Sequence, residues 1–405
     1  MKKIFYLEPY VYKQIEDDNF LLYNSLTGKY RFKKNEDELF FFKKFLHKDY
    51  IVLDNFFNQT ISDFINYLKN NFFGEIRESV EEKHYQHSPN IVTAFDEEDY
   101  HNKSLSDFIS DLTIYINGEC TKSCACSFCK TAYKQFPFCT KLENTELKYK
   151  EIEDILSNFH PKYLLNININ GGNILNHSEF ESIVYFLNNY IPKKNYYINN
   201  KNLSFENVNK IHSIGSNSQL IILFSSIPSS SEFHNVKILL ENINIPLKWT
   251  FVIKSEKDFK LIDNLKIFDL DYNLYPFINS KNKSFIKKNV LLNLKEILSI
   301  PKLSYKQILE KNQFNLLLWG KTYILNNKDF YLNLNSVKLG TVFIDNIYDP
   351  ILNIIINGHK GVWYLTRNVV LPCKHCVYRI FCPPISNYEL FSKKYNFCNI
   401  KKKLL

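Results

Sequence analysis

The chain has 405 residues, a formal charge of +9 at pH 7 and 45% hydrophobic residues. Single cores rarely grow beyond about 250 to 300 residues, so we expect two or three domains. No apolar run is long enough to span a bilayer, and Glu8 interrupts the start of the chain before it resembles a signal peptide, which predicts a soluble, cytoplasmic protein without a membrane partner. The basic residues are scattered in short runs, which argues against nucleic-acid binding.

Residues 1–76 predict a small winged-helix-like module. Short alternating segments at 11–15 and 20–23 precede a turn and a further strand at 29–32, and helical patterns follow at 36–47 and 61–71. Residues 77–109 are polar and charged without a sustained period, which is typical of a linker.

From residue 112 onward, strand-like runs alternate with amphipathic stretches. We expect strands at 112–117, 163–170, 195–200, 220–226, 246–253 and 270–278, and helices at 147–158, 179–189, 232–242 and 256–268. This spacing suits a strand, a crossover helix and two short loops. Residues 110–290 therefore predict an α/β fold with a parallel sheet, open or curled into a partial (β/α)6 TIM-like barrel. Beyond residue 290 the alternation is lost, and residues 291–405 are expected to form a separate C-terminal module.

Eight of the nine cysteines fall into two groups, and Cys139 lies close to the first group. Cytoplasmic thiols are kept reduced, so clustered cysteines indicate metal binding, catalysis or redox chemistry. The first group comprises Cys120, Cys124, Cys126 and Cys129. It follows the first predicted strand, and loops at the carboxyl ends of parallel strands carry the active sites of such folds.

A [4Fe-4S] cluster that also binds a small molecule takes three thiolates from one loop and leaves one iron open. Cys120 and Cys129 supply two of them, with either Cys124 or Cys126 as the third. The alternative is a loop whose thiols bind zinc or no metal.

This loop resembles that of radical SAM enzymes, whose partial barrel carries C-x3-C-x2-C after its first strand, with an aromatic residue before the third cysteine. Phe128 stands at the aromatic position. Cys120 to Cys124 fits the first half of the motif, and Cys126 to Cys129 fits the second, but no triple fits both. The resemblance implies a [4Fe-4S] cluster and S-adenosylmethionine at this loop.

In the same family, a Gly-Gly-Glu segment after the second strand holds the amino group of the methionyl moiety. Gly171, Gly172 and Asn173 stand here, and Asn173 lacks the charge of the acid. Glycine also lets backbone approach a ligand closely, although a plain turn would equally explain the pair. Ser225, at the end of the fourth strand, is by position a candidate contact to the cofactor carboxylate or ribose, or a simple loop serine.

The second cysteine group has the spacing C-x2-C-x5-C followed by a distant cysteine. Cys373, Cys376, Cys382 and Cys398 are enough for one zinc ion or one [4Fe-4S] cluster. A zinc ribbon normally repeats C-x2-C twice, and this chain contains it once here.

This group resembles the SPASM module that follows many radical SAM barrels, in which these thiols hold the outer of two auxiliary clusters. The resemblance assigns Cys373, Cys376, Cys382 and Cys398 to one auxiliary [4Fe-4S] cluster. Ser386 and Asp345 stand where the inner cluster would take ligands, so a second auxiliary cluster is not expected.

The amino-acid sequence around the C-terminal cysteines shows a narrower resemblance, which extends over roughly residues 110–400. The segments Trp363-Tyr-Leu-Thr-Arg367, Phe381-Cys382-Pro-Pro-Ile-Ser-Asn-Tyr-Glu389 and Asn396-Phe-Cys398 resemble the pseudo-radical-SAM proteins found with GG-type natural-product precursors of Bacteroidales. This implies an iron–sulfur protein of ribosomal peptide natural-product (RiPP) maturation, a partner or scaffold that acts with a radical SAM maturase on a precursor peptide. The N-terminal module would recognise the leader as an added strand.

Two alternatives stay open. The chain would be an active radical SAM enzyme that cross-links or cyclises the peptide, with a second [4Fe-4S] cluster and S-adenosylmethionine at the Cys120 loop, or a zinc-binding interaction protein. No catalytic residue is assigned, because nothing distinguishes Glu119, Lys130 or Tyr133 from solvated residues near the loop.

Overall fold

The computed structural model describes residues 2–16, 18–46, 50–53, 58–79, 107–120, 126–159, 161–265, 267, 269–357 and 361–400. Residues 2–79 form two small antiparallel sheets and two helices. The first sheet has the order β5 (Tyr50–Leu53), β1 (Lys2–Leu7), β6 (Gly74–Ser79), and the second has the order β2 (Val11–Glu16), β3 (Asn19–Asn24), β4 (Tyr30–Phe32).

Helices α1 (Glu36–Lys43) and α2 (Gln59–Asn70) begin where the side chains of Asn35 and Asn58 accept hydrogen bonds from backbone amides of their first turns. The predicted hairpin, third strand and two helices are therefore present. A winged-helix identity stays a prediction, and β6 continues past residue 76, where the module was predicted to end. The core between these elements is rich in phenylalanine, including Phe5, Phe20, Phe41, Phe42, Phe45 and Phe64.

The large sheet of the described chain has the strand order β12-β11-β10-β9-β8-β7-β13-β14-β15. Its strands are β7 (Asp111–Tyr115), β8 (Asn166–Asn170), β9 (Lys193–Asn199), β10 (Ser218–Phe224), β11 (Leu247–Ile253), β12 (Tyr272–Pro276), β13 (Lys321–Ile324), β14 (Asp329–Tyr331) and β15 (Gly340–Thr341). β7 to β12 pair in parallel, in chain order, and coincide with the six predicted strands. A mixed α/β fold with a mostly parallel sheet is thus confirmed, whereas curling into a partial barrel stays a prediction.

Helices between the strands pack on one face of this sheet. They are α4 (Tyr149–Ser157), α5 (Phe180–Asn188), α6 (Phe205–Val208), α7 (Ser230–Leu239) and α8 (Glu256–Asn264). The four predicted helices correspond to α4, α5, α7 and α8. Their apolar sides join the strand residues Leu112, Ile114, Ile167, Ile169 and Ile222 in the main core, because alternate strand residues point to this face. Helix α3 (Cys126–Ala132) instead packs on the opposite face, through Cys129 and Ala132.

The opposite face of the sheet has two chemically different halves. On β7 and β8 the alternate residues are polar: Asp111, Thr113, Tyr115, Asn166, Asn168 and Asn170 line a cavity. On β10 and β11 they are apolar, where Ile221, Leu223 and Val252 pack with Phe136 and Phe138. One polar and one apolar half therefore share this face.

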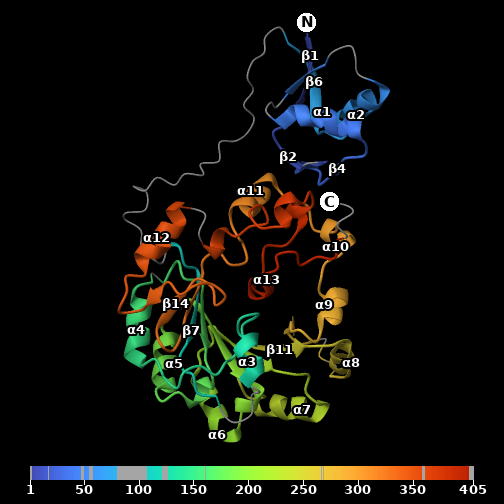
Figure 1. Cartoon of the computed structure of the whole chain (residues 1–405). Helices are drawn as coiled ribbons and strands as arrows, with labels where there is room; N and C mark the ends of the chain where they lie inside the picture. The colour runs from blue at the N-terminus through green and yellow to red at the C-terminus, as the bar shows by residue number, and fades with distance from the viewer. Residues whose placement is uncertain are drawn as a thin grey trace.

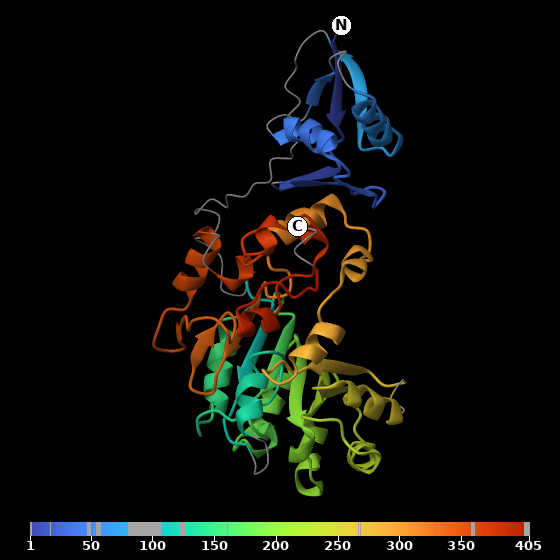
Figure 2. The same ribbon diagram turned by 45° about the vertical axis from the view of Figure 1, so that its right-hand side comes forward.

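The C-terminal residues both extend the sheet and bridge it to the N-terminal part. β13 pairs with β7 in parallel, and β14 and β15 follow antiparallel. The helices of this region are α9 (Lys283–Asn289), α10 (Leu294–Leu298), α11 (Tyr305–Gln313), α12 (Tyr348–Asn357) and α13 (Asn387–Ser392). Figures 1 and 2 show α10, α11 and α13 between the N-terminal sheets and the large sheet. The predicted modules at 291–405 and 110–290 are thus joined by shared strand pairing, and a SPASM identity stays a prediction.

No helix in the described ranges combines the length and apolar character needed to cross a membrane.

The main core generates the first prediction. Ile222 is fully buried, so Ile222→Ala should lower the free energy of unfolding by about 2 to 5 kcal/mol through lost contacts and a cavity. Ile191 is 72% exposed, and Ile191→Ala should change it by less than about 0.5 kcal/mol. Urea unfolding followed by circular dichroism measures both, and equal effects of the two substitutions would show that the burial assignment is wrong.

Candidate functional site

The four C-terminal cysteines converge beside the N-terminal module. Cys373, Cys376 and Cys382 are buried, and Cys398 is partly buried. Burial raises the pKa of the Cys382 thiol to about 12, and negative charge on Cys376, Cys373 or Cys398 acts in the same direction. Cys376 and Cys382 belong to one buried apolar cluster, against which Cys398 packs, and Cys373 lies one tight turn before Cys376. The structure thus places these four thiols in one region of the C-terminal part, while their role as one ligand set stays a prediction.

Two tight turns present the first three thiols. Cys373 begins the 3-10 helix η8 (Cys373–His375), and its carbonyl accepts a hydrogen bond from the Cys376 amide at 2.9 Å. Cys382 follows η9 (Arg379–Phe381), with its amide 3.2 Å from the Arg379 carbonyl. Such turns place the sulfur atoms of a C-x2-C pair on one side of the backbone.

A buried guanidinium connects the segments that carry these thiols. Arg367 donates to both carboxylate oxygens of Glu389, at 2.5 and 3.0 Å, and to the carbonyls of Tyr395 at 2.6 Å and Pro383 at 3.1 Å. Its Nη1 lies 3.6 Å from the Cys373 sulfur. Glu389 is 1% exposed, so this bidentate pair is shielded from water. Arg367 therefore holds the turns and supplies positive charge beside the thiols.

A second cation, Lys311, lies near Cys382. The Lys311 amine donates to the Ile380 carbonyl at 2.6 Å, two residues before Cys382. Burial lowers the pKa of Lys311 to about 8, although negative charge on Cys382 opposes this shift. Sequence reasoning missed Lys311, because its approach to the thiols depends on how α11 packs against η9.

The donor set fits a four-thiolate metal group in its chemistry. Four neighbouring sulfur atoms are soft ligands, and two cations stand near them to offset the net negative charge of a thiolate-bound centre. Within the described residues, no three His, Cys, Asp or Glu side chains form a group that could hold a metal ion as they stand. The fit to a metal group therefore rests on the chemistry of the thiols and the nearby cations.

The first cysteine group is described only in part. Cys120, in the segment after β7, is partly buried, and Cys129 of α3 is buried in the cluster that includes Leu223 and Val252 of the sheet. Cys124 lies outside the described residues, and of Cys126 only the backbone position at the start of α3 is described. A metal role of this group stays a prediction.

The two glycines after β8 are explained by the packing of two loops. A Cβ on Gly172 would lie 1.9 Å from the Glu119 carbonyl oxygen, and one on Gly171 would lie 2.4 Å from the Asn117 side-chain oxygen. The Asn173 amide donates to the Glu119 carbonyl at 2.6 Å, and its side-chain oxygen caps η4 (Ile174–Asn176). Glycine is thus required without any ligand, and a cofactor contact of this segment stays a prediction.

A lysine that the sequence reading did not single out occupies the same edge of the sheet. The Lys254 ammonium donates to the Ser225 carbonyl at 2.6 Å and lies 4.5 Å from the centre of the Phe128 ring. Burial lowers the pKa of Lys254, and negative charge on Cys129 would oppose that shift. Lys254 directly follows β11, and this position at a strand end is the signal that could have identified it.

The Arg367–Glu389 pair generates the second prediction. Arg367→Met leaves a buried carboxylate without a partner, which should lower the free energy of unfolding by about 3 to 5 kcal/mol. The double variant Arg367→Met/Glu389→Leu should recover most of this loss, because the unpaired charge is gone. Lys288→Met breaks an exposed pair with Glu256 and serves as the control, with little change expected. Urea unfolding of the metal-free chain measures the free energy of unfolding of each variant. A double variant no more stable than Arg367→Met would contradict the charge argument.

Comparisons with known proteins add similarities of limited extent. No protein-family model matches the chain. The DNA-directed RNA polymerase subunit beta of Plasmodium falciparum (isolate 3D7) is 29% identical over 178 residues, which is 41% of this chain and only 17% of that subunit. Crystal structures of Streptococcus suis SuiB, alone, with S-adenosylmethionine and with its precursor peptide SuiA, align over 98 to 99% of this chain and 99 to 100% of theirs, at 12 to 13% identity and a TM-score of 0.46. Similarity at these levels transfers no function to this chain.

Proposed function

We propose that this chain is an iron–sulfur protein of RiPP maturation, a pseudo-radical-SAM partner or scaffold that acts with a radical SAM maturase on a precursor peptide. The observation that carries the proposal is the burial of Cys373, Cys376 and Cys382 in one region with Cys398, in a sequence context that resembles the SPASM module. They would hold one auxiliary [4Fe-4S] cluster, and such a cluster would supply electron transfer or structural support at this place. Because it needs reduced thiols, we assign the protein to the cytoplasm.

Two cations of the chain, Arg367 and Lys311, stand near the buried thiols and would stabilise them as thiolates. Burial raises the pKa of Cys376 to about 11, so without a metal the thiol stays protonated at neutral pH. Metal binding would then release protons. Arg367 and Lys311 remain to balance the negative charge, and the turns fixed by Arg367 keep the segments in place.

Two features at the edge beside β8 and β11 favour the partner role over an enzyme that cleaves S-adenosylmethionine. The Asn173 side-chain oxygen already caps a helix, so it is not directed at a ligand ammonium. Lys254 places a cation beside Phe128 and near Cys129, where a sulfonium cofactor would meet charge of the same sign.

The N-terminal module supplies a peptide-binding edge in this proposal. β4 is an edge strand, and a leader peptide would add to it as a further strand. The rings of Tyr30 and Phe32 on β4 lie 5.4 and 6.3 Å from the ring of Phe381, next to Cys382. A leader held at β4 would therefore run close to the thiol group.

Metal content provides the first test. After anaerobic reconstitution with iron and sulfide, the chain should hold about four irons, and Cys382→Ala should lose most of them. Cys139→Ala is the matched control and should keep them, because Cys139 packs in the apolar half of the sheet face. Zinc without iron in the purified chain would overturn the proposal in favour of the zinc-binding protein, and about eight irons would point to the radical SAM enzyme.

Cofactor cleavage provides the second test. Reconstituted protein, incubated with S-adenosylmethionine and dithionite, should release no more 5′-deoxyadenosine than a Cys120→Ala/Cys129→Ala variant. Liquid chromatography with mass detection measures the product. Release that depends on these two cysteines would contradict the partner role and establish the enzyme alternative.

A further inference from the structure

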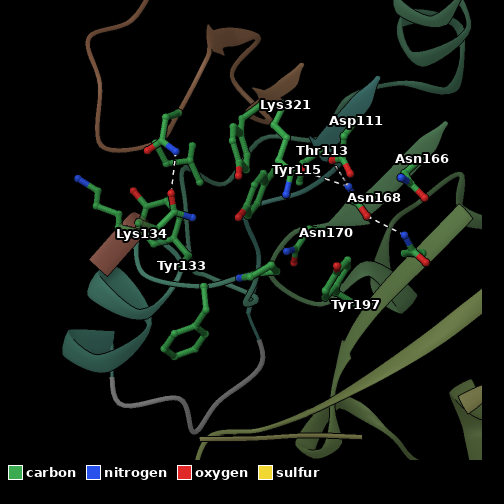
Figure 3. Close-up of a pocket in the computed structure, with 17 residues that line it drawn as sticks. Asp111, Thr113, Tyr115, Tyr133, Lys134, Asn166, Asn168, Asn170, Tyr197 and Lys321 are labelled. Atoms are coloured by element: carbon green, nitrogen blue, oxygen red, sulfur yellow. Dashed lines mark hydrogen bonds between the residues drawn. The ribbon is translucent and has the colours of Figure 1, made fainter. Parts of the chain in front are cut away.

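A cavity of about 220 Å³ lies against the polar half of the sheet face. Its lining comes from alternate residues of β7, β8, β9 and β13, from the segments after α3 and after β14, and from Asn387 at the start of α13 (Figure 3). Asp111, Asn166, Asn195 and Lys321 are partly exposed, so the cavity is open to solvent near the amino ends of these strands. The volume is below the roughly 300 to 1,000 Å³ of sites for drug-sized ligands, so it suits one side chain or chain end.

The carboxylate of Asp111, the acid in this cavity, already accepts a hydrogen bond within the protein. Asn168 donates to the Asp111 carboxylate at 2.7 Å and accepts from the Asn195 amide at 2.9 Å. Burial raises the pKa of Asp111, while Lys321 and the amides of Asn168 and Asn166 oppose the shift. A ladder of amides across β7, β8 and β9 therefore occupies the acceptor that would otherwise bind a ligand cation.

The groups left for a ligand are donors. The Lys321 ammonium has neither an ion pair nor a hydrogen bond within the described chain. It lies near enough to Asp111 to lower the pKa of the Asp111 carboxyl. The hydroxyls of Tyr115 and Tyr197 likewise find no hydrogen-bond partner in those residues, and Tyr115 is only 1% exposed. Burial raises the pKa of both phenols, so they keep their protons at neutral pH.

Two lysines line this small polar space, Lys321 and also Lys134, whose ammonium lies 5.9 Å from the centre of the Tyr133 ring. Together with the two phenolic donors they favour a negatively charged acceptor. We propose that this cavity binds a carboxylate of the precursor peptide, from an acidic side chain or the C-terminus, with Lys321, Tyr115 and Tyr197 as its donors. The site rests on the proposed function for the identity of its ligand. A charge-assisted hydrogen bond from Lys321 gives it preference over a neutral amide of the same shape.

The test uses the full-length chain and three small probes in isothermal titration calorimetry. N-acetyl-glutamate amide carries only a side-chain carboxylate, N-acetyl-glutamine carries only a terminal one, and N-acetyl-glutamine amide carries none. One of the first two should bind at least about tenfold more tightly than the third, and the preferred probe identifies the source of the carboxylate.

Three variants locate the site. Lys321→Met keeps the aliphatic stem and should remove the tenfold preference, Tyr115→Phe should reduce it several-fold, and Lys288→Met, on the exposed face of α9, should leave it unchanged. Equal affinity for all three probes, no binding of any probe at millimolar concentration, or a preference that survives Lys321→Met would overturn the inference. Iron content of the same samples separates the two proposals, since carboxylate binding without iron would refute only the cluster, and iron without carboxylate binding would refute only this site.

Discussion

The buried ion pair of Arg367 and Glu389 is the interaction on which the C-terminal half of this protein depends. A guanidinium taken out of water needs an acceptor for nearly every N–H, and Arg367 finds these in Glu389 and in the carbonyls of Tyr395 and Pro383. These acceptors belong to segments that precede or follow Cys382 and Cys398 in sequence. Satisfying one buried cation therefore fixes the paths of the chain that bring distant thiols to one place.

The segments that carry Cys376 and Cys382 also form an interface with the N-terminal module. Gln14 on β2 donates to the Cys376 carbonyl at 2.9 Å, and Glu16 forms an ion pair with Arg379. The Phe32 ring lies 4.8 Å from that of Tyr378, within the range of favourable aromatic pairs. Because the turns that carry Cys376 and Cys382 are part of this interface, the order of the thiol group and the docking of the module are physically linked.

The sequence predicted the sheet well and the site only in outline. Six strands were found because apolar alternation is local, and each strand buries one face against helices. The parallel pairing of β13 with β7 was missed, because residues about 200 positions apart meet through tertiary packing that no local pattern encodes. The Gly171–Gly172 pair shows the same limit, since sequence cannot tell a ligand from the Glu119 carbonyl as the reason for close approach. The polar face was readable in Asn166-Ile-Asn-Ile-Asn170, where every second residue is an amide.

Helix α13 connects the two places where this protein has unusual polar chemistry. Glu389 holds Arg367 beside the thiols, while Asn387, two residues earlier, accepts a hydrogen bond from Asn333 at the wall of the cavity. Residues two apart on a helix project to different sides, so one short helix faces both places. A shift of α13 that broke the Arg367 contacts would also move Asn387. The thiol group and the cavity thus share one structural element while their ligating atoms stay separate.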